Sequence, residues 1–527
     1  MNDSDNPYLE QIHRTLPRML ALYDRDPFST TLGQGDRKRW AWKLIDFGNG
    51  TFLGAAHGLA RLLQHDLLPE WIAPTAALRR IEAIFQCAES LRDSNGSYVE
   101  SFPHESSFCV TALVVYDLLS AVECLEGHID SETRERWLET IRPAVGFLVR
   151  VDEYHGMISN HLATAAAGLV KWSDLSGESV DDRARFFVDR ILKHGSEEGW
   201  FQEYEGADPG YQTLCLYYLA DLHRLRPAWG LAEPLHRAIV FLSCFIHPDG
   251  SFGGIYGSRN TRLYYPAGPE FLAASGNRGA ASMAAPMRDS IRRMATVTLE
   301  VMDEHNLPPM FNAYCWAAAI WAEEGAKECL STDPVPAYLQ SPFRRHFPEA
   351  GLLVDGSSRH YTVISLNKGG VCYHFSKDGK STPVRIDGGV VLRDRKGTLF
   401  CSQGYRRNHR VVVEAEQVRV EVPLSPVKHR LPSPLEFTVL RLLNMTLMRN
   451  VTLGNWIKRF LVWLLITGKG TPPGTHVRTI HLGPDLAIDD ETRPKTGHVL
   501  ETVGSGKEFS AIHMASQGYW QRQDDCA

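Results

Sequence analysis

The chain lacks the cysteine patterns that would assign it to a metal-binding or disulfide-rich class. Its 527 residues include ten cysteines but no C-x-x-C pair, and no Cys/His group has the spacing of a zinc site. Most cysteines have apolar neighbours, as in Phe108-Cys109-Val110. We therefore expect buried free thiols in a reducing compartment and no structural zinc.

The chain also lacks a net excess of positive charge and has few long apolar runs. The net charge of -6 and the pI of about 6.4 give no general electrostatic reason to bind nucleic acid or an anionic membrane. The stretch Met1 to Pro7 is acidic and polar rather than basic and then apolar, which predicts no secretory signal and a cytoplasmic protein.

The nearest approach to a membrane signal is the apolar run within Ile457 to Thr467. It is shorter than the roughly 20 residues that a spanning helix needs, so no transmembrane segment is expected. Basic residues on both sides of the run allow a weak contact with a membrane surface instead; they are Arg441, Arg449, Lys458, Arg459 and Lys469.

Length and periodicity predict two domains. A single core stops growing at roughly 250–300 residues, well below this length. Up to Glu328 the sequence consists of amphipathic helices joined by short turns, which is typical of an α-solenoid or a closed α/α toroid. Similar Gly-aromatic loops at Asp93 to Tyr98, Glu197 to Phe201 and Pro248 to Phe252 favour closure. Residues 1–328 are therefore predicted to form a toroid of helical hairpins.

The pattern changes after Pro334. Short β-branched runs and polar-apolar alternation follow, most clearly from Arg410 to Val422, and these predict strands. The proline-rich residues 329–347 are predicted to be a linker, and residues 348–527 a β-rich domain. The expected fold class is thus α+β and multidomain.

The first candidate for chemistry is Ser159-Asn160-His161, directly before an apolar helix. Asn160 fits an N-cap, whose side chain would accept a bond from a helix N–H. His161 would lie in the first turn, where the helix dipole disfavours the protonated imidazole and leaves a proton acceptor. The sequence supports both the cap and the functional interpretation.

The second candidate is the loop Trp200 to Gln212, which contains Glu203, Tyr204, Asp208 and Tyr211. A phenol can both donate and accept a proton once positive charge lowers its pKa of about 10. The structural alternative is that the aromatic residues close the core and Asp208 caps the next helix.

The third candidate is the loop Ile255 to Pro266, with Tyr256, Arg259 and Asn260. An arginine can hold a carboxylate through two parallel hydrogen bonds while sugar rings stack on tyrosines. A solvated loop is the alternative.

Other candidates are less specific. Asn49, His104 and Glu105 lie next to predicted helix starts, so capping explains part of each. His374 lies within the strand-like Tyr373-His374-Phe375, and a lone strand histidine is more often structural than catalytic.

Taken together, Asn160-His161, the loop ending in Tyr211, the Tyr256 to Asn260 loop and His374 resemble the heparinase II/III-like and related alginate lyases. The resemblance implies an α/α toroid joined to an antiparallel β-sandwich. It also implies that Asn160 and His161 neutralise a uronate carboxylate, that Tyr211 or Tyr204 is the family's tyrosine, and that His374 is its β-domain histidine. The expected substrate-binding residues are Asn49, His104, Glu105, Glu203, Tyr204, Asp208, Tyr256, Arg259 and Asn260.

The implied activity is β-elimination on an anionic oligo- or polysaccharide that contains uronic acid. No cofactor is required, and a metal in the β domain has no ligand set to support it. Two alternatives remain open. One is a glycoside hydrolase of the α/α-toroid kind, with its carboxylate pair drawn from Glu100, Glu105, Glu203 and Asp208. The other is a glycan-binding protein of the same fold without activity.

Overall fold

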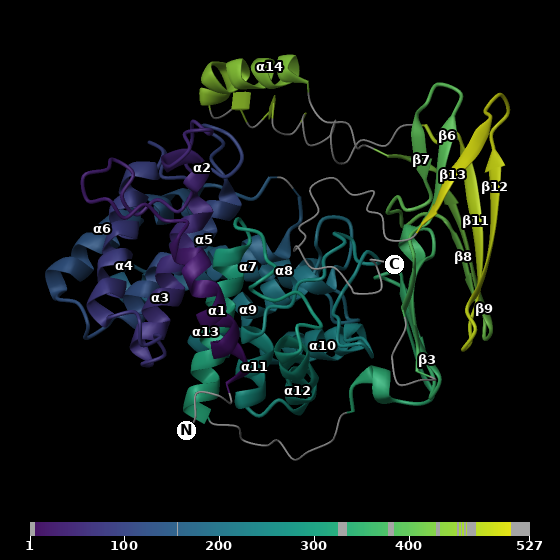
Figure 1. Ribbon diagram of the computed structural model, residues 1–527, viewed down its shortest axis with the longest axis horizontal. Coiled ribbons are helices and arrows are strands. Elements are labelled where there is room, and N and C mark those ends of the chain that lie inside the picture. Colours follow the sequence, from purple (N-terminus) through teal and green to yellow (C-terminus); the bar gives the residue numbers. More distant parts are fainter. Residues whose placement is uncertain are drawn as a thin grey trace.

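A helical domain precedes a domain of antiparallel sheets (Figure 1). The computed structural model describes residues 6–154, 156–324, 335–377, 384–427, 433–450, 453–454, 456–457, 460 and 471–506. The order of the two domains confirms the fold class predicted from the sequence.

The helical domain is built around a closed inner ring. Within the described residues the ring has six helices: α3 (Ala55–Gln64), α5 (Phe108–Cys124), α7 (Ser159–Ser176), α9 (Pro209–Leu225), α11 (Ala267–Ala274) and α13 (Leu307–Glu324). Each packs against the next, and α13 packs against α3. Helices such as α5 and α7 are buried on nearly every side, as expected for a helix that is apolar all round. The predicted toroid is therefore confirmed.

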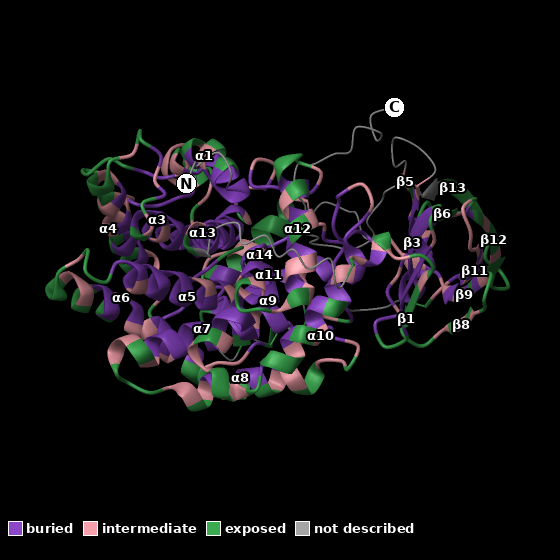
Figure 2. Ribbon diagram, turned by 90° about the horizontal axis from the view of Figure 1, so that it is seen from below, coloured by how far each residue is buried: buried purple, intermediate pink, exposed green. Residues whose placement is uncertain are grey.

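A second layer of helices surrounds the ring. It consists of α1 (Pro7–Leu20), α4 (Pro74–Leu91), α6 (Ser131–Arg150), α8 (Asp181–His194), α10 (Ala232–Leu242) and α12 (Arg278–Arg292). These helices bury one face, as α8 does with Phe187 and Ile191, and expose the other (Figure 2). Because outer and inner helices alternate along the chain, the inner helices all begin at the same end of the toroid.

Short helical turns complete the chain trace. They are α2 (Arg37–Trp40), η2 (Gly50–Gly54), η3 (Pro227–Trp229), η4 (Ser243–Phe245), η5 (Ala337–Leu339), η6 (Leu366–Lys368) and η7 (Leu447–Arg449), and the longer helix α14 (Pro434–Met445) lies among the strands in sequence.

Three antiparallel sheets form the second domain. The first has the order β1-β2-β3-β4-β5, the second β10-β7-β6-β13 and the third β12-β11-β9-β8. The strands are β1 (Phe343–Phe347), β2 (Leu352–Gly356), β3 (His360–Ser365), β4 (Val371–Ser376), β5 (Val384–Asp387), β6 (Gly389–Asp394), β7 (Leu399–Cys401), β8 (Arg410–Val413), β9 (Gln417–Pro423), β10 (Ser425–Pro426), β11 (Gly474–His481), β12 (Ala487–Pro494) and β13 (Leu500–Gly506).

The central strands of the first sheet, β2, β3 and β4, are buried on both faces. Side chains of one face, such as Leu353 and Ile364, pack against Val420 and Ile480 of the third sheet. Those of the other face, such as Tyr373, belong to the core of the helical domain. This packing confirms a sandwich, and it places the first sheet directly against the toroid.

Two boundaries differ from the prediction. Strand β1 lies inside the predicted linker 329–347 and pairs with β2, and residues 325–334 lie outside the described residues. The exposed Arg344, Arg345 and His346 of β1 leave no apolar alternation in the sequence. The stretch Arg410 to Val422 is divided into the hairpin β8-β9 rather than forming one strand.

The apolar run within Ile457 to Thr467 lies largely outside the described residues. Among the helices that are described, none has the length and apolar character needed to cross a bilayer.

Candidate active site

Asn160 holds a side chain of the neighbouring loop rather than capping its own helix. The N-cap of α7 is Ile158, which makes no side-chain cap bond, so the cap interpretation of Asn160 was wrong. Asn160 Nδ2 instead donates to Glu203 Oε1 at 2.8 Å. The loop is drawn to the start of α7 by Ser159, whose hydroxyl donates to the carbonyl of Gln202 at 2.7 Å.

His161 is oriented by a carboxylate that the sequence did not reveal. Its Nδ1 lies 2.7 Å from Glu153 Oε2, and Glu153 is buried. The carboxylate keeps the imidazole proton on Nδ1, so Nε2 carries the lone pair. No residue in the described part of the chain bonds to Nε2, and the His161 side chain is 17% exposed. His161 is therefore placed to accept a proton.

Arg259 lies between two tyrosine rings. Its guanidinium carbon is 4.4 Å from the centre of the Tyr204 ring and 5.6 Å from that of Tyr211, which are cation-π distances. Burial raises the pKa of Tyr204, although Arg259 opposes the shift. Tyr211, in the first turn of α9, and Tyr204 are both partly exposed. Either phenol can therefore meet a ligand.

Asp208 fastens the two loops together. As the N-cap of α9 it accepts from the backbone N–H of Tyr211 at 3.1 Å, and its other oxygen accepts from the N–H of Arg259 at 2.8 Å. The hydroxyl of Thr261 also donates to it, and the side chain is fully buried. Asp208 therefore positions Tyr211 and Arg259 and is not available to a substrate.

Glu203 is a buried acid in the middle of this arrangement. Burial raises its pKa to about 8, against the lowering effects of Arg259 and of the Asn160 hydrogen bond. The carboxyl group is therefore protonated at neutral pH.

The β domain braces the Arg259 loop. Lys368, at the end of η6, donates to the carbonyl of Gly257 at 2.9 Å and also to the carbonyl of Ile255 and to Asn260 Oδ1. Burial lowers the pKa of Lys368 to about 7. In the protonated form, its ammonium group donates all three protons to these three oxygen acceptors. Asn260, whose side-chain oxygen accepts from Lys368, therefore helps to hold its own loop in place.

Other predicted residues have local roles. Tyr256 is buried, with its hydroxyl 2.9 Å from His247 Nε2. Glu105 accepts from two backbone N–H groups, those of residues 100 and 101. Asn49 caps η2 and bonds to His305 at 2.9 Å. His104 has its Nδ1 3.8 Å from a carboxylate oxygen of Asp93.

His374 is not brought to this cluster. Along β4 its neighbours in sequence, Tyr373 and Phe375, face the toroid, so His374 faces the other sheets. Its Nδ1 lies 2.8 Å from the hydroxyl of Thr362 and its Nε2 3.0 Å from the carbonyl of Pro484. The structure gives His374 a place within the sandwich.

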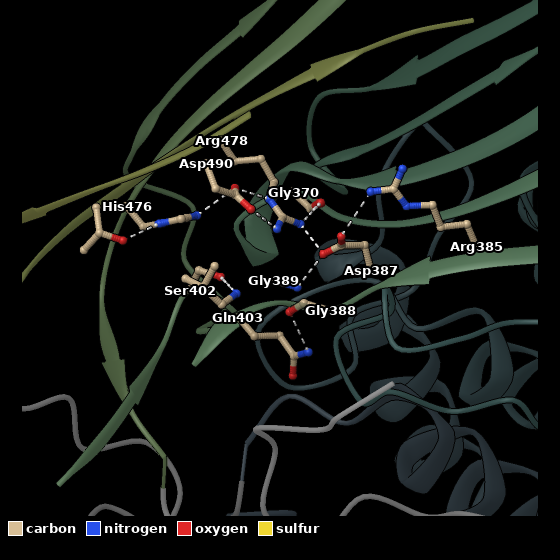
Figure 3. Close-up of polar contacts among 12 residues, drawn as sticks. Gly370, Arg385, Asp387, Gly388, Gly389, Ser402, Gln403, His476, Arg478 and Asp490 are labelled. Carbon is tan, nitrogen blue, oxygen red and sulfur yellow. Dashed lines mark hydrogen bonds and ion pairs between the residues drawn. The ribbon is translucent and has the colours of Figure 1, made fainter. Parts of the chain in front are cut away.

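A second polar cluster lies within the β domain (Figure 3). Arg478 makes two bonds to Asp490, at 2.8 and 2.7 Å, and one to Asp387 at 2.8 Å. His476 bonds to the same Asp490 at 3.0 Å and to Thr492 at 3.1 Å. In the described part of the chain, no group of three or more His, Cys, Asp or Glu is arranged to hold a metal ion.

Comparison with known proteins gives similarity of fold only. No family model and no curated protein matches the chain. A Streptomyces coelicolor A3 chondroitin AC lyase in complex with chondroitin sulphate is 10% identical, with a TM-score of 0.47 over 97% of this chain and 81% of its own. Heparinase III is 11% identical, with a TM-score of 0.44 over 93% and 78%.

A Paenibacillus xanthan lyase is 11% identical, with a TM-score of 0.46 over 81% of this chain, which spans 46% of the length of that lyase. A cellobiose 2-epimerase, a D-mannose isomerase and a family 88 glycosyl hydrolase match 60% of this chain. At these identities and TM-scores we draw no conclusion about activity from any of them.

Proposed function

We propose that the protein cleaves a uronic-acid-containing glycan by β-elimination, and that the catalytic groups are Asn160, His161, Tyr211 and Arg259. One observation carries the proposal: Asn160, Arg259 and Tyr211 come from three separate segments, yet contacts through Glu203 and Tyr204 join them where the inner helices α7 and α9 begin, and His161 follows Asn160 in the first turn of α7. The set combines an amide, an imidazole, a phenol and a guanidinium.

The cationic part of the set suits the first requirement of the reaction. The C5 proton of a uronate becomes acidic only when the adjacent carboxylate is neutralised, because the developing negative charge spreads onto it. Arg259 offers a planar pair of donors for a carboxylate, and Asn160 offers an amide beside it.

The imidazole and the phenol suit the second requirement, which is transfer of a proton from C5 and to O4. His161 presents Nε2 as a base while Glu153 stabilises the imidazolium that forms. Tyr211 lies beside the Arg259 cation, with the centre of its ring 5.6 Å from the guanidinium carbon. In this scheme either group abstracts the C5 proton, and Tyr211 protonates the departing O4.

The hydrolase alternative has less support in the geometry. A glycosidase needs two carboxyl groups on either side of one bond. Asp208 is buried and bonded to the backbone, Glu105 is bonded to the backbone as well, and Glu203 is held by Asn160. Three of the four candidate acids are thus held in contacts within the protein, and the fourth, Glu100, is exposed.

The test is to incubate the protein with a panel of uronate polymers and to follow two signals. An eliminase produces a C4–C5 double bond, which absorbs in the ultraviolet. A hydrolase produces reducing ends without that absorbance and would overturn the proposal. Binding without either signal would leave the inactive glycan-binding alternative.

A further inference from the structure

Helix α14 projects from the β domain and lies over the helical domain near α2 (Figure 1). A capping box of Ser433 and Glu436 begins it, with Pro434 in the first turn. Its position is fixed by Arg441, which forms a 2.7 Å ion pair with Asp46 and lies over the ring of Phe47. The helix is therefore well formed and docked on the loop that follows α2.

The surface of α14 is apolar and exposed. Phe437 and Leu442 are each 58% exposed, and the exposed apolar residues of α14 and η7 are Leu435, Phe437, Val439, Leu442, Met445 and Leu447. The hydroxyls of Thr438 and Thr446 bond back to carbonyls of the helix, at 2.9 and 2.6 Å, so they add little polarity. A helix that is apolar all round normally lies in a core or in contact with a membrane. Here it faces outward.

Helix α2 and the loop after it, on which α14 docks, add exposed apolar and basic side chains. In the loop, Trp42 is 61% exposed and Leu44 and Lys43 are also exposed, and Arg37 and Lys38 are exposed residues of α2. The acidic neighbours are already used, since Asp36 caps α2 and Asp46 pairs with Arg441. This part of an acidic protein is therefore locally basic.

We propose that this surface binds an anionic lipid bilayer. We call it the α14 surface and define it by the six apolar residues named above, by Trp42 and Leu44, and by Arg37, Lys38, Lys43 and Arg449. Apolar side chains enter the boundary between headgroups and acyl chains, aromatic rings sit at the interface, and basic residues meet anionic headgroups. A second copy of the chain fits this surface less well, because the basic residues of the two copies would face and repel each other.

The experiment is sedimentation of the full-length protein with vesicles. We expect little binding to phosphatidylcholine alone and at least about tenfold more binding when phosphatidylglycerol is included, with a fall as salt is raised. Equal binding to both vesicles, or none to either, would overturn the proposal. Association of the protein with itself in the absence of vesicle binding would overturn it in favour of a second copy.

Variants separate the two parts of the surface. The double variant Phe437→Glu, Leu442→Glu should abolish vesicle binding, and Lys38→Glu with Lys43→Glu should remove the preference for anionic lipid. Leu339→Glu is the matched control, because Leu339 is 59% exposed but lies on η5 beside the first sheet. Since all these positions are exposed, thermal melting should change little. Loss of binding in the control, or retained binding in the first double variant, would contradict the assignment.

Discussion

The polar cluster of the β domain and the cluster at the toroid differ in how far their hydrogen-bonding groups are already bonded within the protein. In the β domain each side chain meets a matched partner: Arg478 is held by two aspartates and both ring nitrogens of His476 are bonded (Figure 3). At the toroid, the described residues bond to His161 through one nitrogen only, and burial raises the pKa of Glu203 to about 8, so that it carries a proton at neutral pH. Buried charge is therefore a poor sign of a site, whereas an oriented group with a remaining donor or acceptor is a better one.

The sharpest test of this contrast is Tyr211→Phe. The variant keeps the ring beside Arg259 and loses only the hydroxyl, so we expect turnover of a uronate substrate to fall by about 10³-fold while binding and thermal stability are kept. Initial rates and a binding isotherm measure the two effects. Tyr256→Phe is the matched control, since Tyr256 is buried against His247. Unchanged turnover would remove Tyr211 from the proposed mechanism.

For the β-domain cluster we expect a substitution to lower stability and to leave activity unchanged. Arg478→Met removes the buried cation that bonds to the half-buried Asp387 and the exposed Asp490, which should lower the free energy of unfolding by about 1–3 kcal/mol. The folded fraction should keep its activity. Denaturant unfolding, together with rates corrected for the folded fraction, checks both points, and the exposed Arg493→Met serves as control. A specific loss of activity in the folded fraction would show that this cluster contributes to the site.

The sequence predicted the architecture because the architecture depends on periodicity. Inner helices that are apolar all round and outer helices with one apolar face are both visible as patterns of residues. Helix-start loops were also good candidates, because alternating hairpins must bring them to one end. Asn160, His161 and Tyr211 were predicted as catalytic groups in this way, and Arg259 was predicted to bind substrate from its own loop. The roles of all four are still a prediction.

Partners that depend on long-range packing could not be predicted. Glu153 follows a helix end and resembles any surface acid in the sequence, yet it is buried against His161. Lys368 comes from the other domain, more than a hundred residues from the loop that it braces. Asp208 was expected among substrate ligands, but its oxygens are occupied by backbone groups that only the fold brings together.

A smaller effect is expected from Glu153→Gln. Glutamine keeps the shape but no longer stabilises an imidazolium or fixes the proton on Nδ1, so turnover should fall by about 10²-fold. Initial rates measure this effect, and denaturant unfolding measures stability. A stability loss with unchanged turnover in the folded fraction would give Glu153 a purely structural role. Glu105→Gln offers a comparison with a carboxylate bound to backbone.

The smallest expected effect is the contribution of Glu203 to the pH dependence of stability. The pKa of Glu203 in the folded state, about 8, lies above that of an ordinary glutamate. The folded state therefore keeps a proton that the unfolded state releases. Stability from this residue is therefore fully present below the ordinary glutamate pKa and is lost as pH rises toward 8. The expected slope is about 1.4 kcal/mol per pH unit between about pH 5.5 and pH 7.5.

Glu203→Gln cannot ionise, and its amide can still accept from Asn160, so this slope should be absent in the variant. Unfolding curves at several pH values measure it, with the exposed Glu233→Gln as control. If wild type and variant show the same slope, Glu203 is ionised in the folded protein and pairs with Arg259. The guanidinium would then be neutralised before any substrate arrives, and the toroid cluster would resemble the β-domain cluster in having every charge matched.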